Sequence, residues 1–260
     1  MTILDELAAY ARERVARAKE NISLAELRHM ALASPKGSFA FENALKTDDI
    51  AFICECKKAS PSKGLIAPDF PYLQIALDYE AAGADCISVL TEPKWFLGSN
   101  DYLKEIAENV KIPCLRKDFT VDEYMIYEAK LLGASAVLLI AAILSQEQLS
   151  EYIDICDGLG LSALVEAHDE AEAIAAINAG ARIIGVNNRN LKDFSVDTEN
   201  SRRLRSMIPA SVLFVSESGV RTAEDVQALR DIGADAVLIG ETLMKAQDKR
   251  QKLTELRGCK

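Results

Sequence analysis

The feature that most constrains the fold of this chain is a short phrase that recurs four times along it. Each copy ends a helical pattern with a Gly-Ala pair and leads into a continuous apolar run. The copies are Ala82-Gly-Ala-Asp85, Leu132-Gly-Ala-Ser135, Ala179-Gly-Ala-Arg182 and Ile232-Gly-Ala-Asp235. A glycine ends a helix at little conformational cost, and an unbroken apolar run is typical of a parallel strand buried on both faces. The repeat therefore predicts a parallel α/β fold.

The spacing of the repeat predicts how many strands the sheet contains. Successive copies are about 50 residues apart, twice the length of one strand-plus-helix unit, so each gap should hold a second strand. Apolar runs ending in polar residues fill the gaps at 112–117, 162–166 and 212–217, and another opens the series near 51–57. Amphipathic stretches predict helices between strands, for instance over 122–131, 146–156, 169–178 and 223–230.

Eight alternating strand and helix units over residues 49–260 predict an α/β fold of the (β/α)8 type, a TIM barrel, for which about 250 residues is typical. An open, doubly wound sheet is the rival architecture. Its dinucleotide-binding form has G-x-G-x-x-G after the first strand, and no such motif is present there. We therefore expect the barrel.

Residues 1–48 precede the first expected strand and predict an N-terminal helical extension. The stretch from Ile3 to Lys19 contains apolar residues at helical spacing, which predicts a first helix. Ser23-Leu-Ala-Glu26 is a capping box that begins a second helix. A short third helix is expected over 39–45. We expect the extension to pack on the bottom or flank of the barrel, with its charged face in solvent. Residues 49–260 then form the barrel domain.

Composition and charge argue against several classes of function. A net charge of −10 disfavours binding to nucleic acids or anionic membranes, but it leaves room for a local cationic pocket. The longest apolar run, 136–144, is shorter than the ~20 residues of a transmembrane helix, and no signal peptide is evident. The six cysteines include no C-x-x-C pair, which favours reduced thiols. We expect a cytoplasmic monomer or weak homodimer with no nucleic-acid or membrane partner.

The first strand and the loop after it contain the clearest candidate chemistry. Side chains alternate along a strand, so Glu55 and Lys57 point to the same side as Ile53. Cys54 and Cys56 point to the opposite side of the strand. An acid and a base at a strand end, followed by Ser60-Pro-Ser-Lys-Gly64, suit a site that holds an anion and moves protons. The cysteines are expected to pack against helices.

Polar residues also end the other expected strands. In a TIM barrel the chemistry lies at the C-terminal strand ends, so these side chains should meet at one rim. Burying unpaired charge costs free energy, so charges from several independent strands favour a site over a purely structural role. The residues are Glu92, Lys117, Asp118, Glu166, Asn187, Asn188, Arg189, Glu217 and Glu241.

Lys117 and Glu166 are the clearest acid–base candidates, because each closes an apolar run and should face inward. A lysine and a glutamate a few ångströms apart shift each other's pKa, which lets each act as an acid or a base near neutral pH. We expect Lys117 to be a general acid. The alternative is a Lys117–Glu166 ion pair that only ties two strands together.

Phosphate is the expected anion. In TIM barrels the loops after the seventh and eighth strands commonly bind phosphate with backbone N–H groups and a helix N-terminus. Ser218-Gly219 and Gly240 occupy these two loops, and Ser60 and Lys63 are placed to close over the same group. The expected partner is therefore a small phosphorylated molecule.

Other chemistries are not favoured by this sequence. His29 and His168 are expected to be surface or packing residues, so neither a metal site nor a Ser-His-Asp triad is predicted. Trp95 and Phe96 follow the second expected strand. They either form the wall of an aromatic-substrate site or anchor their loop, and both alternatives stay open.

Together these strand-end motifs resemble those of the indole-3-glycerol phosphate synthase family, over almost the whole chain and in the same order. The residues that carry the resemblance lie at 55–64, 89–92, 115–119, 164–166, 185–191, 216–219 and 238–240. The resemblance implies closure of the indole ring of 1-(2-carboxyphenylamino)-1-deoxyribulose 5-phosphate in tryptophan biosynthesis. Carbon dioxide and water are released, and the family uses neither metal nor cofactor.

The resemblance also implies a role for each candidate residue. Lys117 would protonate the ketone oxygen as the ring carbon attacks, and Glu166, with Glu55 and Lys57, would handle the later protons and the loss of hydroxide. Lys57 would also meet the anthranilate carboxylate. The remaining assignments place Asn187 and Glu217 at polar groups of the substrate, Arg189 in support of them, and Ser60, Ser218, Gly219 and Gly240 at the phosphate.

One position departs from the family pattern, and two alternative functions stay open. Glu241 stands where many relatives carry serine beside the phosphate, so a backbone N–H contact is the one expected there. A Schiff-base aldolase would use Lys57 or Lys117 as its nucleophile. A non-catalytic barrel would bind a phosphorylated ligand without turning it over.

Overall fold

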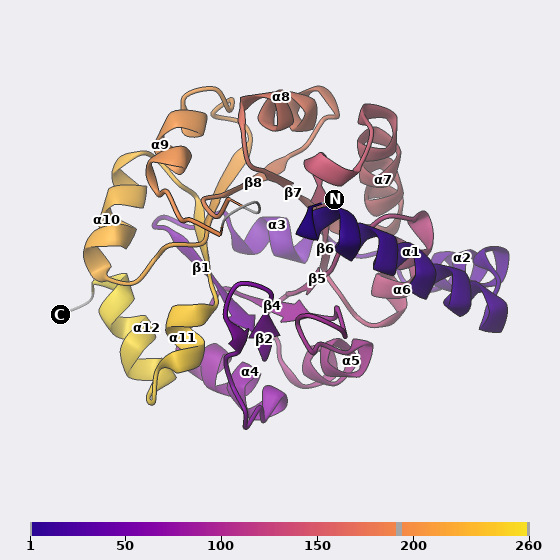
Figure 1. Cartoon of the computed structure of the whole chain (residues 1–260), viewed down its shortest axis with the longest axis horizontal. Helices are drawn as coiled ribbons and strands as arrows, with labels where there is room; N and C mark the ends of the chain where they lie inside the picture. The colour runs from indigo at the N-terminus through magenta and orange to yellow at the C-terminus, as the bar shows by residue number, and fades with distance from the viewer. Residues whose placement is uncertain (1, 191–193, 259–260) are drawn as a thin grey trace.

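Eight parallel strands form a closed barrel with helices around it (Figure 1). The computed structural model describes residues 2–190 and 194–258. In their order around the barrel, the strands are β1 (Ala51–Cys56), β10 (Ala236–Ile239), β9 (Leu213–Glu217), β8 (Ile183–Asn187), β7 (Ser162–Ala167), β6 (Ala136–Ile140), β5 (Cys114–Lys117) and β4 (Cys86–Leu90). The predicted TIM barrel is confirmed.

Helices connect the strands, and most of them begin at a side-chain cap. Ser145 and Thr222 each start a helix with a capping box, in which the hydroxyl accepts a backbone N–H and the third helical residue returns a hydrogen bond. The helices of the barrel are α4 (Tyr72–Ala81), α5 (Asn100–Asn109), α6 (Glu123–Leu131), α7 (Gln146–Leu159), α8 (Glu170–Asn178), α9 (Glu199–Arg205), α10 (Ala223–Asp231), α11 (Glu241–Lys245) and α12 (Lys249–Arg257), with a 3-10 turn η1 (Ala141–Ile143) after β6.

The glycines of the fourfold repeat end helices, as the sequence predicts. Gly83, Gly133, Gly180 and Gly233 have φ angles of 86°, 85°, 84° and 73°. Glycine adopts this left-handed conformation without the penalty that a Cβ imposes. Each helix can therefore stop there and turn into the next strand.

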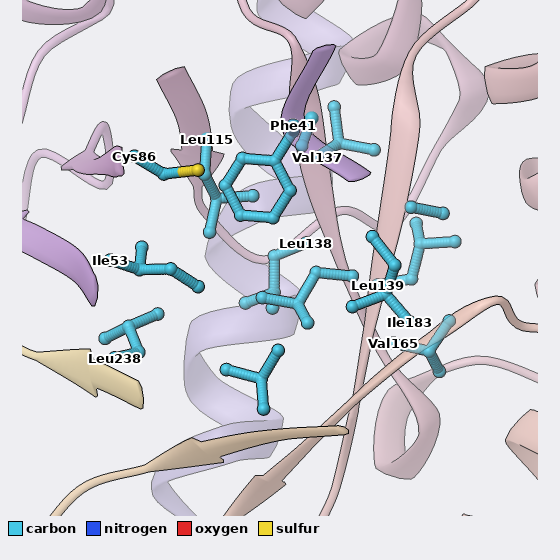
Figure 2. Packing of buried hydrophobic residues seen from close by; sticks show 14 of the residues in the cluster. Phe41, Ile53, Cys86, Leu115, Val137, Leu138, Leu139, Val165, Ile183 and Leu238 are labelled. Atoms are coloured by element: carbon cyan, nitrogen blue, oxygen red, sulfur yellow. The ribbon is translucent and has the colours of Figure 1, made fainter. Parts of the chain in front are cut away.

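The interior of the barrel is filled with apolar side chains from every side (Figure 2). Ile53 of β1 and Leu115 of β5 are fully buried members of this cluster. Inward-facing residues recur at every second position of a strand, so the next inward residues are Glu55 and Lys117. The same strand faces that build the core thus carry the charged side chains at their C-terminal ends.

Helix α3 (Ala40–Ala44) closes the N-terminal end of the barrel. Phe41 is fully buried and belongs to the cluster in Figure 2. The Glu42 N–H donates to Ser162 Oγ, at the start of β7 (3.1 Å), and Arg182 Nε, just before β8, donates to the Glu42 carboxylate (2.8 Å). Helix α2 (Leu24–Ala33) packs against α6 on the flank of the barrel.

Helix α1 (Ile3–Asn21) instead lies at the C-terminal end of the barrel, so the expected bottom or flank position is wrong for this helix. Arg14 donates to both carboxylate oxygens of Asp118, at 2.6 and 3.1 Å, and Lys19 pairs with Asp122 at 2.7 Å. Burial raises the pKa of Asp118, but Arg14 and Arg116 outweigh burial and hold that pKa below its ordinary value. Part of the charged face of α1 is therefore an interface and not a solvated surface.

The loop after β1 forms a short hairpin that the sequence did not predict. Its strands are β2 (Ala59–Ser60) and β3 (Gly64–Leu65), paired antiparallel. The Ala59 N–H donates to the Phe96 carbonyl at 3.2 Å, which ties the hairpin to the loop after β4. The hairpin thus has a defined position beside the C-terminal end of the barrel.

Two further sequence predictions concern cysteines and membranes. The described cysteines, at positions 54, 56, 86, 114 and 156, are buried free thiols. Within residues 2–190 and 194–258, no helix combines the length and the apolar character needed to cross a membrane. Leu191, in one strand-end motif, and Cys259 lie outside the described residues.

Replacing Phe41 with alanine is expected to lower the free energy of unfolding by about 3–5 kcal/mol, because a fully buried aromatic ring is lost and its cavity cannot collapse completely. Urea denaturation followed by circular dichroism measures the change. Met30→Ala on α2, where the side chain is 44% exposed, is the control and should stay within about 0.5 kcal/mol of the wild type. Equal stability of both variants would contradict the role of Phe41 at the barrel end.

Candidate active site

A cavity of about 390 Å³ opens at the C-terminal end of the barrel. Strand ends from around the barrel line it, and Ile3 and Leu7 of α1 form part of its wall. This is the end at which TIM barrels carry their active sites. Most of the residues that the sequence predicted for the site line the cavity: Glu55, Lys57, Ser60, Lys117, Glu166, Asn187, Arg189, Glu217, Ser218, Gly219 and Gly240. Glu92, Asn188 and Lys63 are not among its lining residues.

The ammonium of Lys117 lies between two buried carboxylates. Its Nζ is 2.9 Å from Glu166 Oε2 and 3.4 Å from Glu217 Oε2. The side chains of Glu166 and Glu217 are 3% and 2% exposed. A buried charge without a partner is costly, so one ammonium here serves two acids from different strands. The Lys117–Glu166 pair considered from the sequence is present, but it is shared with Glu217 inside a cavity.

The protonation of Lys117 follows from these neighbours. Burial lowers the pKa of Lys117, but the carboxyl groups of Glu166, Glu217 and Glu55 outweigh burial and hold that pKa above its ordinary value. Lys117 is therefore an ammonium near neutral pH. Its amine is therefore held in the charged form and not as a free amine.

The two carboxyl groups beside Lys117 differ in protonation. Burial raises the pKa of Glu166, but Lys117 and His168 outweigh it and hold the pKa below its usual range. Burial and the neighbouring Glu166 raise the pKa of Glu217 to about 8, although Lys117 opposes them. The shifts run in opposite directions, so the surroundings favour the carboxylate form of Glu166 and the carboxylic acid form of Glu217. Similar groups with separated pKa values are typical of acid–base catalysts.

Glu55 and Lys57 form a second ion pair at the end of β1. Both line the cavity, as their alternation along the strand predicts, while Cys54 and Cys56 are buried on the other side. Glu55 is 3% exposed, so its partner is needed to offset desolvation. The cavity therefore contains two acid–base pairs from different parts of the barrel.

Two glycines leave space for these side chains. A Cβ on Gly185 of β8 would overlap Glu217 Oε1. A Cβ on Gly240, after β10, would overlap Glu55 Oε1 and approach Lys57 Nζ to 2.8 Å. Gly240, predicted from the sequence as a phosphate contact, thus also makes room for the pair at the end of β1.

Asn187 links the acid–base groups to the loops that the sequence predicts for phosphate. Its Nδ2 donates to Glu166 Oε1 at 3.3 Å. Its Oδ1 accepts from the Arg189 N–H at 3.0 Å and from the Ser218 hydroxyl at 2.9 Å. One side chain therefore positions residues from β7, from the loop after β8 and from the loop after β9.

Ser218 and Gly219 form a turn with an unusual backbone. Their φ angles are 68° and 103°, and the first is uncommon for a residue with a Cβ. The Ser218 carbonyl accepts from Asn188 Nδ2 at 3.0 Å, and Asn188 is itself buried. Such local strain is held by surrounding contacts and is frequent at ligand sites, where successive N–H groups can face one anion.

Three cations surround the carboxylate of Glu241. The distances from its oxygens are 2.6 Å to Lys245 Nζ, 3.8 Å to Lys63 Nζ of the hairpin, and 4.0 Å to Arg189 Nη2. Burial raises the pKa of Glu241, but these cations, Lys245 first, hold that pKa below its usual value. The residue that departs from the family pattern is thus an anion held at the cationic end of the cavity.

Two rim carboxylates predicted to meet the others have structural partners instead. Glu92 accepts the backbone N–H groups of Lys94, Trp95 and Phe96 at 2.8–2.9 Å and so shapes the loop after β4. Asp118 touches the cavity but is held by Arg14. Backbone N–H groups of its own loop bind the Glu92 carboxylate, and Arg14 of α1 binds the Asp118 carboxylate. The position of these residues at a strand end does not predict such partners.

The two aromatic residues after β4 have different roles, although the sequence left open whether they line the site or anchor their loop. Phe96 lines the cavity and packs on Phe119, with 5.9 Å between ring centroids. Trp95 packs edge-on against Tyr10 of α1, with 5.6 Å between centroids. Phe96 is therefore part of the wall, and Trp95 anchors the loop to α1.

His168 is the residue that the sequence interpretation misjudged. Its Nε2 lies 3.3 Å from Glu166 Oε1 and its Nδ1 lies 3.0 Å from Glu172 Oε2, so it is neither a surface nor a simple packing residue. Its position two residues after Glu166 is the signal that could have found it, because alternation places both on one side. In the part of the chain that is described, no group of three or more His, Cys, Asp or Glu side chains is arranged to hold a metal ion.

Glu217 is expected to remain protonated at neutral pH and to lose its proton as the pH rises through about 8. Infrared spectroscopy should show the carbonyl stretch of a buried carboxylic acid that disappears over this range. Glu217→Gln should lack the band, whereas Glu170→Gln, at an exposed position, should retain it. A wild-type protein without the band at neutral pH would show that Glu217 is ionised.

Comparison with known proteins adds an independent line of support. The family model described as indole-3-glycerol phosphate synthase matches residues 4–256. The indole-3-glycerol phosphate synthase of Ruminiclostridium cellulolyticum is 60% identical over 98% of this chain and 99% of its own length. That of Leuconostoc mesenteroides is 51% identical over 99% and 100%.

Solved structures support the fold alone. The 3-hexulose-6-phosphate synthase of Salmonella typhimurium superposes with a TM-score of 0.65 at 14% identity, over 80% of this chain and 97% of that chain. The family assignment comes instead from the match across nearly the whole sequence, which includes the motifs at the strand ends around the cavity. This chain belongs to the indole-3-glycerol phosphate synthase family.

Proposed function

We propose that this protein is an indole-3-glycerol phosphate synthase. It closes the indole ring of 1-(2-carboxyphenylamino)-1-deoxyribulose 5-phosphate, a step of tryptophan biosynthesis that releases carbon dioxide and water. The observation that carries the proposal is the position of Lys117 Nζ inside the cavity, 2.9 Å from Glu166 and 3.4 Å from Glu217, two buried carboxyl groups from different strands. Family membership supports the same activity.

The cavity matches a substrate with an anion at each end. Ser218 and Gly219 offer backbone N–H groups, and Arg189 a guanidinium, to the phosphate. Lys57 is the cation for the ring carboxylate, and Phe96 offers an aromatic wall to the ring. The substrate then spans the acid–base groups that lie between these contacts.

The first step forms a carbon–carbon bond and needs an acid. The ring carbon that bears the carboxylate attacks the ketone carbon, and the ketone oxygen takes the electron pair of its double bond. Lys117 gives that oxygen a proton, since its amine is held in the ammonium form. Carbon dioxide leaves next, and the electrons of its bond restore the aromatic ring.

The second step removes water from the alcohol formed in the first. The hydroxyl must receive a proton in order to leave, and the neighbouring carbon must lose one to complete the indole double bond. Glu166 is an ionised base for the second transfer, and the Glu55–Lys57 pair is an acid–base pair in the same cavity. Protonated Glu217 and Asn187 are placed to orient the hydroxyl groups of the substrate.

The alternatives are less well supported by these contacts. A Schiff-base aldolase needs a neutral amine as nucleophile, but Lys117 is held as an ammonium by surrounding carboxyl groups. A barrel that only binds a phosphorylated ligand has no use for buried acids of separated pKa. A cytoplasmic location and a monomeric or weakly dimeric state are part of the proposal.

The decisive measurement is indole fluorescence after mixing the protein with the carboxyphenylamino-deoxyribulose phosphate. Lys117→Ala should reduce kcat by about 10²–10⁴-fold with a similar KM, because it removes the general acid and leaves the anion contacts in place. Lys104→Ala, at an exposed position on α5, is the control. Absence of fluorescence with folded wild-type protein would reject the activity, and covalent labelling of Lys57 or Lys117 by borohydride with substrate would favour the aldolase.

Glu241→Gln is expected to tighten the binding of inorganic phosphate by about two- to fivefold, the size of a partly exposed charge interaction. Glu241 repels a phosphate dianion and competes for Lys63, Arg189 and Lys245, while glutamine keeps the shape without the charge. Isothermal titration calorimetry measures the affinity, with Glu224→Gln on α10 as the exposed control. Weaker phosphate binding in Glu241→Gln would mean that the carboxylate organises the cations more than it repels the ligand.

A further inference from the structure

His168 lies where it acts on only one of the two carboxyl groups beside Lys117. Its Nε2 is 3.3 Å from Glu166 Oε1, on the oxygen that Lys117 does not contact. The ring is 16% exposed and lies behind Glu166, outside the set of residues that line the cavity. It can therefore act on the reaction only through Glu166.

Two helices hold the ring in this position. Glu172 of α8 accepts both His168 Nδ1 at 3.0 Å and the His168 backbone N–H at 2.8 Å. The His168 carbonyl accepts from Asn200 Nδ2 of α9 at 3.0 Å. Asp169 caps α8 through the Glu172 N–H at 3.0 Å, which fixes the carboxylate that orients the ring.

Glu217 has no comparable second cation. Among the described residues its ion-pair partner is Lys117, and its Oε1 has no hydrogen-bond partner. Glu166 has Lys117 on one oxygen, and His168 and Asn187 near the other. When one ammonium lies between two acids, a second positive charge near only one of them decides which acid stays ionised.

We propose that His168 is a positioning residue: as an imidazolium clamped by Glu172, it holds Glu166 in place and ionised, so that Glu166 and not Glu217 serves as the base. This inference rests on the proposed function, because it explains how two similar acids in one cavity acquire different roles. His168 itself does not touch the substrate.

The charges around the group support an imidazolium. Burial lowers the pKa of His168, but Glu166 and Glu172 outweigh burial and raise that pKa to about 10. The charged groups that face Glu166 and His168 from neighbouring elements are Glu172 on α8, Lys117 on β5 and Glu217 on β9. Glu55 on β1 acts on both Lys117 and Glu217.

The first test is the pH dependence of kcat in His168→Gln. Removing the cation raises the pKa of Glu166, so the acidic limb of the profile should move to higher pH by about one to three units. Below that limb, kcat should fall about tenfold for each unit by which the pKa rises, with KM little changed. The deficit should shrink as the pH increases. His29→Gln, an exposed histidine on α2, should leave the profile unchanged.

Glu172→Gln is the second variant, and it keeps the imidazole while removing the carboxylate that clamps it. It should move the acidic limb in the same direction by a smaller amount. If His168→Gln does not fold, as judged by circular dichroism, this variant decides the kinetic test. An unchanged limb in the folded variants, or the same loss of kcat at every pH, would overturn the proposal, because a purely structural role lowers activity without moving the limb.

A titration of the imidazole nitrogens by NMR tests the pairing without any assay of activity. In the wild type, the His168 signals should stay those of an imidazolium well above pH 8, and in Glu172→Gln they should titrate at lower pH. A neutral His168 ring at pH 7 would overturn the proposal. A wild-type protein without synthase activity would reject the proposed function instead, and the titration would still decide whether His168 carries the charge that it needs to act on Glu166.

Discussion

The ammonium of Lys117 lies between two buried carboxyl groups, and this arrangement constrains the strands around it. Strands β5, β7 and β9 have to end at one level so that Lys117, Glu166 and Glu217 come together. Gly185 on β8 has to lack a side chain, because a Cβ there would occupy the place of the Glu217 carboxyl group. Desolvation makes such a cluster costly, and it persists because apolar layers directly below supply the packing that a charged layer cannot.

The N-terminal extension belongs to this arrangement. Helix α1 is fastened to the rim by Arg14, which supplies the countercharge for buried Asp118, and it contributes Ile3 and Leu7 to the cavity wall. The hairpin after β1 and the loop shaped by Glu92 lie at the same end of the barrel. These elements lower the exposure of the acid–base groups, and lower exposure strengthens the electrostatic coupling between them.

Charge is distributed unevenly along the cavity. The chain as a whole carries −10, yet Lys63, Arg189 and Lys245 gather at one end, where Glu241 holds them. Asn187 connects this end to Glu166 through hydrogen bonds on both sides of its amide. Contacts at the cationic end and the orientation of Glu166 are therefore linked through Asn187, as the proposed reaction requires if a distant phosphate is to position the reacting carbons.

The sequence by itself determined the barrel and most of the charged residues that line the cavity. The Gly-Ala repeat and the strand alternation are local signals, and strand order then brings Glu55, Lys57, Lys117 and Glu166 to one rim. Only the tertiary structure decided that α1 crosses that rim, that Asp118 pairs with Arg14, and that His168 stands behind Glu166. It also decided the opposite directions in which the pKa values of Glu166 and Glu217 shift, since a pKa depends on burial and on charges from other strands and helices. Local periodicity specifies the direction in which a side chain points, whereas its partners depend on packing between segments far apart in the chain.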